Sequence, residues 1–214
     1  MFTYVRDFTG EWETIYLPFG FTITEDMAKE FEFAYIYNAS YKGKQATFEF
    51  VEVGVGFNLA ANYPYLVKAR EAGENEIVVE NAKLMPTKVE TIDCSSIFEK
   101  FSFIGNYATV DADNLDDTMG YFSLNGAWSK MDVVNPFRFY MQIQLRNGDA
   151  FEYPSEAQPI RMRSVNANGE ETTGINGVDA EQADDFIFDI HGRRVLETEK
   201  GGIYIKGGKK FIAQ

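Results

Sequence analysis

Short segments in which apolar and polar residues alternate follow one another along most of the chain. In residues 47–53, Phe48 and Phe50 fall on one face of a strand and Glu49 on the other, because successive side chains of a strand point to opposite faces. Many such segments with turn residues between them are typical of an antiparallel sandwich or barrel. We therefore expect an all-β protein with an antiparallel β-sandwich, jelly-roll-like or Greek key, over residues 1–165. Its predicted strands are residues 12–17, 33–37, 46–53, 63–68, 76–79, 97–104, 121–124, 137–145 and 161–163.

Turn and cap signals divide these segments. Pro18 ends the first strand, because proline has no N–H to donate to a neighbouring strand. Asn147-Gly148 is a hairpin signal, since both residues tolerate positive φ, and it predicts that the preceding strand pairs with residues 150–153. Helix signals are scarce, but Thr24 can cap a short helical turn that has acidic residues at its start.

The C-terminal part of the chain differs in composition. Residues 166–185 are rich in Asn, Gly, Glu, Thr and Asp, which predicts a polar linker. Residues 186–214 return to alternation, with a strand at 186–190 and a hairpin that turns at Gly207-Gly208. The sequence thus predicts a sandwich domain, a linker and a small C-terminal β-hairpin tail.

Composition shows how such a fold is stabilised. Aromatic residues are abundant, with 19 Phe, 12 Tyr and 2 Trp, and they favour strands and large buried contacts. The one cysteine, Cys94, excludes an internal disulfide, so core packing alone must hold the fold. No histidine lies near Cys94 in the sequence to activate its thiol, and we expect it to be buried and inert.

The net charge of −13 narrows the classes of partner. An acidic surface repels phosphate backbones, which argues against nucleic-acid binding, and it is compatible with calcium, a basic partner or simple solubility. The chain has no apolar run of about 18 residues, so no membrane span is expected. Residues 1–10 contain Arg6 and Asp7 and lack the apolar core of a signal peptide, so we expect either that an export signal lies upstream of Met1 or that there is none.

Two sets of segments resemble a known group of proteins. The tail segments FDIHGRRV and GGIYIKGGKK resemble the C-terminal tail of many secreted and surface proteins of Bacteroidetes, roughly "iyDlnGrrv…GiYiingkKv", although this tail is shorter than a full type IX secretion sorting domain. A β domain often precedes that tail, and its landmarks "WnTicLPF", "PYlik" and "FRaYf" are similar to segments found here in the same order. Tyr16 stands where those relatives often have Cys, and Phe139 where they often have Ala. The matching segments are WETIYLPF, NYPYLVK, FIGNYA, GYFSLNGAWSK and NPFRFYM.

The resemblance implies an exported β-sandwich carried on larger cell-surface proteins, with no enzyme activity, no cofactor and no catalytic residues to transfer. We therefore expect a noncatalytic structural or adhesive module that works outside the cytoplasm, with a cell-envelope protein or a glycan as its partner. A glycan-binding module is the first alternative. A glycoside hydrolase domain is less favoured, because that chemistry needs two carboxylates at a fixed separation and the 33 acidic residues single out no pair.

Residues that usually carry catalysis give little signal. His191 is the one histidine and sits in a turn beside Gly192, so neither a Ser-His-Asp arrangement nor a zinc site is supported. The basic pairs Arg193-Arg194 and Lys209-Lys210 make the tail locally positive, which indicates either a solvated hairpin edge or a contact with an acidic partner.

An acidic cluster is the weak candidate for a metal site. Calcium takes several oxygen ligands, and acids in one loop can supply them. The EF-hand pattern fails, because Leu115 and Asp116 stand where it needs an acid or Asn and then a Gly. A solvated loop is the favoured interpretation and calcium the alternative, with Asp111, Asp113, Asp116 and Asp117 as ligands.

Aromatic side chains near turns are the candidates for glycan contact. Trp128, Tyr63 and Tyr41 lie near turns and would serve as platforms if exposed; the alternative is core or edge packing. In residues 137–145, alternation places Phe137 and Phe139 on one face and Arg138 on the other. We expect Arg138 to be half-buried against a carboxylate, with ligand contact as the alternative.

Overall fold

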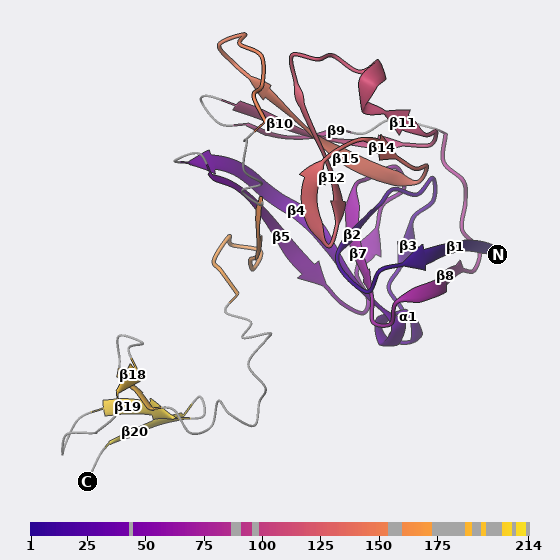
Figure 1. Ribbon diagram of the computed structural model, residues 1–214. Helices are drawn as coiled ribbons and strands as arrows, with labels where there is room; N and C mark the ends of the chain where they lie inside the picture. The colour runs from indigo at the N-terminus through magenta and orange to yellow at the C-terminus, as the bar shows by residue number, and fades with distance from the viewer. Residues whose placement is uncertain are drawn as a thin grey trace. The chain divides into compact units, whose positions relative to one another are not determined.

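The computed structural model forms two compact units, Met1–Thr172 and Thr173–Gln214 (Figure 1). The structure describes residues 1–42, 45–86, 91–95, 99–153, 160–172, 187–189, 194–195, 203–206 and 209–212.

The main sheet of the first unit contains most of its strands. In sheet order they are β16 (Arg161–Ser164), β5 (Gln45–Val53), β4 (Phe31–Lys42), β7 (Tyr65–Ala69), β2 (Glu13–Ile15), β12 (Gly120–Asn125), β15 (Arg138–Leu145), β10 (Glu99–Asn106) and β9 (Thr91–Ser95), with β13 (Ala127–Lys130) paired to β12. The described pairs are antiparallel apart from β16 with β5, which is parallel. Three smaller ladders complete the unit: β1 (Phe2–Phe8) with β8 (Gly73–Val79), β3 (Phe21–Thr22) with β6 (Asn58–Leu59), and β11 (Val110–Asp111) with β14 (Val133–Val134).

The main sheet folds over on itself, so that β4 and β5 face β10, β12 and β15 across a core (Figure 1). Phe48 on β5 is fully buried, and its ring centroid lies 5.5 Å from that of Phe103 on β10. Aromatic pairs at this spacing stabilise a core beyond the area they bury. The expected all-β antiparallel sandwich is therefore confirmed.

A second core lies between β4 and β7 of the main sheet and the β1–β8 ladder. Phe8, Phe33 and Ile77 are at most 2% exposed there. The short helix α1 (Glu25–Glu30) flanks this core, and the Thr24 hydroxyl accepts a hydrogen bond from the Met27 N–H at 3.2 Å. The predicted cap is confirmed, and it satisfies one of the N–H groups that a helix start leaves free.

The predicted hairpin at Asn147-Gly148 is wrong in its pairing. Gly148 has φ of 85°, so the turn itself forms. Residues 150–153 make no strand with β15, and instead the Phe151 N–H donates to the Thr118 carbonyl at 2.8 Å. Phe151 packs on Phe122 of β12, with ring centroids 5.8 Å apart. Burial of this aromatic segment outweighs the local hairpin preference.

The first residues of the expected linker are folded. Residues 166–172 belong to the first unit and form a turn that is closed by a bridge between Val165 and Glu171. The Glu171 carboxylate lies 3.1 Å from Arg163 of β16. Asn and Gly serve tight turns as well as linkers, so composition alone does not separate the two.

The second unit is a small antiparallel sheet in the order β18 (Arg194–Val195), β17 (Ile187–Asp189), β19 (Ile203–Lys206) and β20 (Lys209–Ile212). Lys206 pairs with Lys209, so the predicted hairpin at Gly207-Gly208 is confirmed in its strand pairing.

Candidate functional site

The candidate site is a cleft that lies where β15 and β2 pair with different parts of the same edge of β12. One edge of β12 pairs with β15 over residues 120–122 and with β2 only at Asn125, while β13 occupies the other edge. Ser123 and Leu124 fall between these pairings, where β15 separates and β2 arrives. Sheet strands that separate leave room between them, and polar side chains line this gap.

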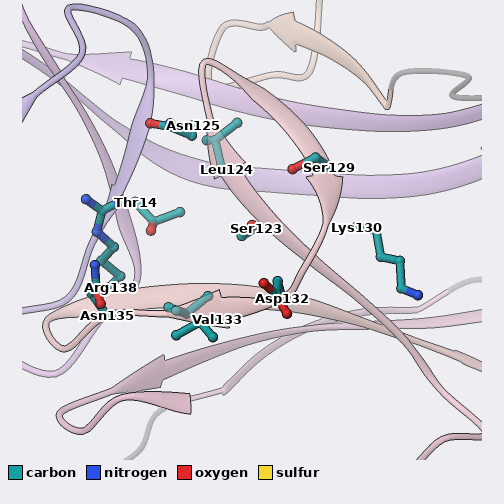
Figure 2. A pocket seen from close by; sticks show the side chains of 11 residues that line it. Thr14, Ser123, Leu124, Asn125, Ser129, Lys130, Asp132, Val133, Asn135 and Arg138 are labelled. Carbon is teal, nitrogen blue, oxygen red and sulfur yellow. The ribbon is translucent and has the colours of Figure 1, made fainter. Parts of the chain in front are cut away.

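The cleft has a volume of about 320 Å³, within the range of small-ligand sites. Figure 2 shows Arg138 and Asn135 at one side of the view and Lys130 at the other, with Ser123 and Asp132 between them. Hydroxyl, amide, cationic and carboxylate groups thus surround one space, and together they can donate and accept hydrogen bonds. The lining residues are Thr14, Ser123, Leu124, Asn125, Ser129, Lys130, Asp132, Val133, Val134, Asn135 and Arg138.

A buried carboxylate, Glu13 of β2, contacts Arg138. The Glu13 side chain is 1% exposed, and its Oε2 lies 3.0 Å from Arg6 Nη2 and accepts the Thr9 N–H at 3.2 Å. Its Oε1 lies 3.7 Å from Arg138 Nη1, too far for a hydrogen bond. Arg138 is 20% exposed. The prediction that Arg138 is half-buried against a carboxylate is confirmed, and two arginines share that one acid.

The two arginines differ in how firmly the protein holds them. Arg6 donates from Nη1 to the Thr14 carbonyl at 3.0 Å and to the Tyr4 hydroxyl at 3.4 Å, and its guanidinium lies 4.4 Å from the ring centre of Phe8. Arg138 makes only the longer contact with Glu13 among the residues described, and it lines the cleft. Arg6 is therefore the structural partner of Glu13, and Arg138 keeps donors for a ligand.

The local environment opposes the charge on Arg138. Burial, and then repulsion from Arg6, lower the pKa of the Arg138 guanidinium, while Glu13 and Tyr4 partly offset both effects. An arginine stays protonated despite such a shift. Arg138 therefore keeps its positive charge, and the neighbouring groups compensate only part of the cost of burying it. An anion in the cleft would relieve this imbalance.

An aromatic cluster, Tyr4, Tyr107 and Phe137, lies outside the lining of the cleft, although Phe137 directly precedes Arg138, which does line it. The Phe137 ring centroid lies 5.9 Å from that of Tyr4 and 5.8 Å from that of Tyr107, and Phe137 is 37% exposed. The expectation that Phe137 and Phe139 share a face is wrong, since Phe139 is fully buried. Phe137 precedes β15 and has φ of 62°, which breaks the alternation.

Two hydrogen bonds of the Phe137 backbone, and a third that fixes Asn135 nearby, hold this left-handed conformation. Its N–H donates to the Asn106 carbonyl at 2.9 Å, and its carbonyl accepts the Tyr16 N–H at 2.9 Å. The Asn106 side chain also donates to the Asn135 carbonyl at 2.9 Å. A bulky residue with positive φ costs about 1–3 kcal/mol and persists only where its surroundings impose it. Such residues concentrate at functional sites.

Tyr107 is fixed from its far end. Its hydroxyl donates to the side-chain carbonyl of Asn62, whose amide donates to the Pro86 carbonyl at 3.1 Å. Burial, and then the neighbouring Tyr16, raise the pKa of Tyr107 well above its ordinary value. Its phenol therefore remains a neutral donor, and the ring offers a fixed support to Phe137.

Trp128, the first glycan candidate, is a core residue. It is 4% exposed, and its ring centroid lies 5.2 Å from that of Phe48. Alternation along β13 turns Ala127 and Ser129 outward and Trp128 inward. Proximity to a turn therefore does not expose this side chain, and the platform interpretation of Trp128 is corrected.

Tyr63, the second aromatic candidate, is not part of the described lining of the cleft either. Tyr63 is partly buried at the edge of the second core, with its ring centroid 4.9 Å from that of Tyr65. The side chain of Tyr41 lies outside the described residues, although its backbone belongs to β4.

The acidic cluster is used by local turns. Asp111 caps the 3-10 helix η1 (Ala112–Asn114) and accepts the Asp113 N–H at 2.9 Å. Asp116 accepts from the Thr118 N–H at 2.9 Å and from its hydroxyl at 2.6 Å, while Asp117 is exposed. Among the described residues, no three of His, Cys, Asp or Glu gather as a metal site. The structure therefore does not bring the calcium candidates together.

The remaining sequence candidates lie apart from the cleft. Cys94 is 8% exposed, which confirms that it is buried. His191 lies outside the described residues, and the side chains of the basic pairs in the tail do as well.

Sequence reasoning identified Arg138 and missed the residues around it. Glu13 and Arg6 lie far from Arg138 in the chain, and no local pattern links them. Alternation places Phe137 on the face of Phe139, because the sequence does not show the contacts with Asn106 and Tyr16 that set its conformation. The order of NPFRFYM contains one clue, since Pro136 favours an extended residue before it and a turn near it.

No family model matches the chain, and neither a curated protein nor a solved structure matches it. Within the described part of the chain, no helix is long and apolar enough to cross a membrane.

Proposed function

We propose that this protein is a noncatalytic adhesive module of the cell envelope that binds a glycan in the cleft between β12 and β15. The cleft offers hydroxyl and amide groups from Ser123, Asn125 and Asn135, which match the hydrogen-bonding groups of a sugar. The aromatic cluster next to Arg138 supplies a ring face, and sugar rings stack their C–H faces on such surfaces.

The conformation of Phe137 carries this proposal. An aromatic side chain that is 37% exposed is held with φ of 62° between two tyrosines. Folding alone gains little from exposing this ring, and a glycine would satisfy the backbone at lower cost. A binding role accounts for both the exposure and the strain.

The charge pattern favours binding over hydrolysis. Glycoside hydrolysis uses two carboxylates that flank the scissile bond. The cleft lining supplies one, Asp132, and the neighbouring Glu13 is held by Arg6 and Arg138. Glu13 would have to leave both arginines to act as an acid or a base.

The setting outside the cytoplasm is part of the proposal and is supported by the resemblance of the tail and the body segments to Bacteroidetes surface proteins. Digestion of intact cells by an added protease tests it. Loss of the protein from intact cells supports a surface location, and protection until the cells are lysed contradicts it.

Binding is tested on a panel of oligosaccharides by the shift in Tm, because a ligand that binds the folded state raises Tm by mass action. Phe137→Gly removes the ring and keeps the backbone conformation, and we expect it to abolish most of the shift. Phe137→Tyr restores a ring and should restore binding. Tyr37→Ala is the matched control, because Tyr37 is also an exposed aromatic, at 38%, on β4. The proposal fails if no saccharide shifts Tm.

A further inference from the structure

The charges around Glu13 leave one positive charge in excess. Arg6 and Arg138 both lie within 4 Å of this single carboxylate, at 3.0 and 3.7 Å. Two cations and one anion sum to a charge of about +1, in a region with low access to water where charges are weakly screened. The chain as a whole carries −13, so this end of the cleft opposes the general charge of the surface.

The excess charge faces the cleft. Arg6 is 9% exposed; its Nη1 donates to the Thr14 carbonyl and the Tyr4 hydroxyl, and its Nη2 lies 3.0 Å from Glu13 Oε2 without a hydrogen bond. Arg138 is more exposed, at 20%, and it is the arginine that lines the cleft. In Figure 2 Arg138 lies on the same side of the view as Asn135 and Thr14, away from Lys130.

Glu13 does not use the hydrogen bonds of Arg138. Glu13 Oε1 is buried and accepts no hydrogen bond among the described residues, although Arg138 Nη1 is only 3.7 Å away. A buried carboxylate normally draws such a donor into a hydrogen bond. Glu13 therefore leaves the donors of the Arg138 guanidinium free, and its N–H groups remain available to a ligand in the cleft.

We propose that the cleft selects saccharides that carry a carboxylate, as uronic and sialic acids do, and that Arg138 binds this group. This inference rests on the proposed function and specifies the class of glycan. A guanidinium fork matches a planar carboxylate with two parallel hydrogen bonds. One surplus positive charge is balanced by one carboxylate, whereas a chain with several sulfates per unit would bring its further charges close to Asp132.

The remaining groups fit the rest of an acidic sugar. Ser123, Asn125 and Asn135 line the cleft and would contact the hydroxyls. Phe137 lies outside the lining but directly precedes Arg138, and its exposed ring would contact the apolar face of a sugar that extends past Arg138. Lys130 is held 4.7 Å from the ring centre of Tyr153 at the other side of the cleft. Lys130 is therefore engaged by an aromatic ring, and Arg138 is the cation left for the carboxylate.

The test uses the whole protein on an array of neutral, uronic-acid, sialic-acid and sulfated oligosaccharides, followed by calorimetry on the strongest acidic ligand and its carboxyl-reduced form. The reduced form keeps the sugar and replaces the carboxylate with a neutral alcohol. We expect the acidic form to bind roughly tenfold tighter or more, as a charge-assisted hydrogen bond allows. Its advantage should shrink between about 50 and about 300 mM NaCl, because salt screens exposed charges.

Variants assign the effect to Arg138. Arg138→Gln should remove the preference for the acidic form and leave the weaker affinity for the reduced form. Arg138→Lys keeps the positive charge beside Glu13 and should retain only part of the preference, because it lacks the fork. Arg70→Gln is the matched control, since Arg70 pairs with Glu32 on other strands, at 2.9 Å, and should leave affinities unchanged. The two forms of the ligand and the salt series decide the question on the unaltered protein even where a variant does not fold.

The outcomes distinguish a failure of the carboxylate inference from a failure of the proposed glycan-binding function. Equal affinity for the acidic and reduced forms, binding of neutral glycans alone, or equal binding of sulfated glycans overturns the carboxylate inference and leaves the glycan-binding function standing. Binding of no saccharide overturns both.

Discussion

Gly105 of β10 lies directly against the ring of Tyr16, and a β-carbon at Gly105 would overlap that ring. Tyr16 is fully buried, and its backbone N–H holds the Phe137 carbonyl at 2.9 Å. Because Gly105 has no side chain, the Tyr16 ring fits beside it, and Tyr16 in turn positions Phe137.

Gly105→Ala is expected to destabilise the fold by about 1–3 kcal/mol, because overpacking a filled core forces neighbouring groups to move. Gly54→Ala is the matched control, since a β-carbon there would meet no atom within 4 Å. Denaturant unfolding measures both free energies. Equal stability of the two variants would show that Tyr16 moves without cost, which contradicts this packing.

Glu13→Gln is expected to cost about 3–5 kcal/mol, because it leaves two buried or half-buried arginines without a counter-charge. The control is Glu32→Gln, which breaks a more exposed pair with Arg70 and should cost no more than about 1 kcal/mol. The free energy of unfolding is compared for the two variants. A loss at Glu13 no larger than that at Glu32 would remove the case for a shared buried carboxylate.

At position 137, glycine is expected to be more stable than alanine by about 1 kcal/mol, because a β-carbon is unfavourable at a φ of 62°. Val133 on β14 is the control position. Its φ is not positive, so the glycine variant should be less stable there than the alanine variant. Chemical denaturation of the four variants gives both differences. The same order of stability at both positions would contradict the left-handed conformation of Phe137.

Stability is expected to fall at alkaline pH partly through Tyr140. Burial, and then the neighbouring Tyr121, raise the pKa of Tyr140 above its ordinary 10.0. Its folded-state pKa exceeds the unfolded value, so its contribution is fully present below pH 10.0 and is lost as pH rises through the folded pKa. Tyr140→Phe should reduce the alkaline loss of stability relative to the unaltered protein. The check is Tm against pH for the two proteins; an unchanged alkaline slope in Tyr140→Phe would contradict the shift.

Local alternation predicted the strands whose two faces differ. Phe48 and Phe50 lie on the inner face of β5, as their spacing from Glu49 indicated. Alternation also placed Arg138 on the face opposite Phe139, which led to the expected contact with a carboxylate. These features depend on the strand geometry of neighbouring residues alone.

The cleft could not be predicted, because it arises where β15 and β2 meet the same edge of β12. That meeting joins Glu13 to residues more than a hundred positions away, and one sequence contains no local signal for it. Trp128 shows the opposite error: a turn nearby suggested exposure, and packing against Phe48 from β5 buries it. Tertiary contacts decide both cases.

The measurement that tests the central claim most directly is the map of amide and side-chain NMR shifts on the isotopically labelled protein during titration with the strongest glycan of the panel. The account predicts that the largest shifts occur at Ser123, Asn125, Asn135, Phe137 and the guanidinium of Arg138. Shifts that leave these groups unchanged and gather on another face would contradict the assignment of the cleft as the binding site.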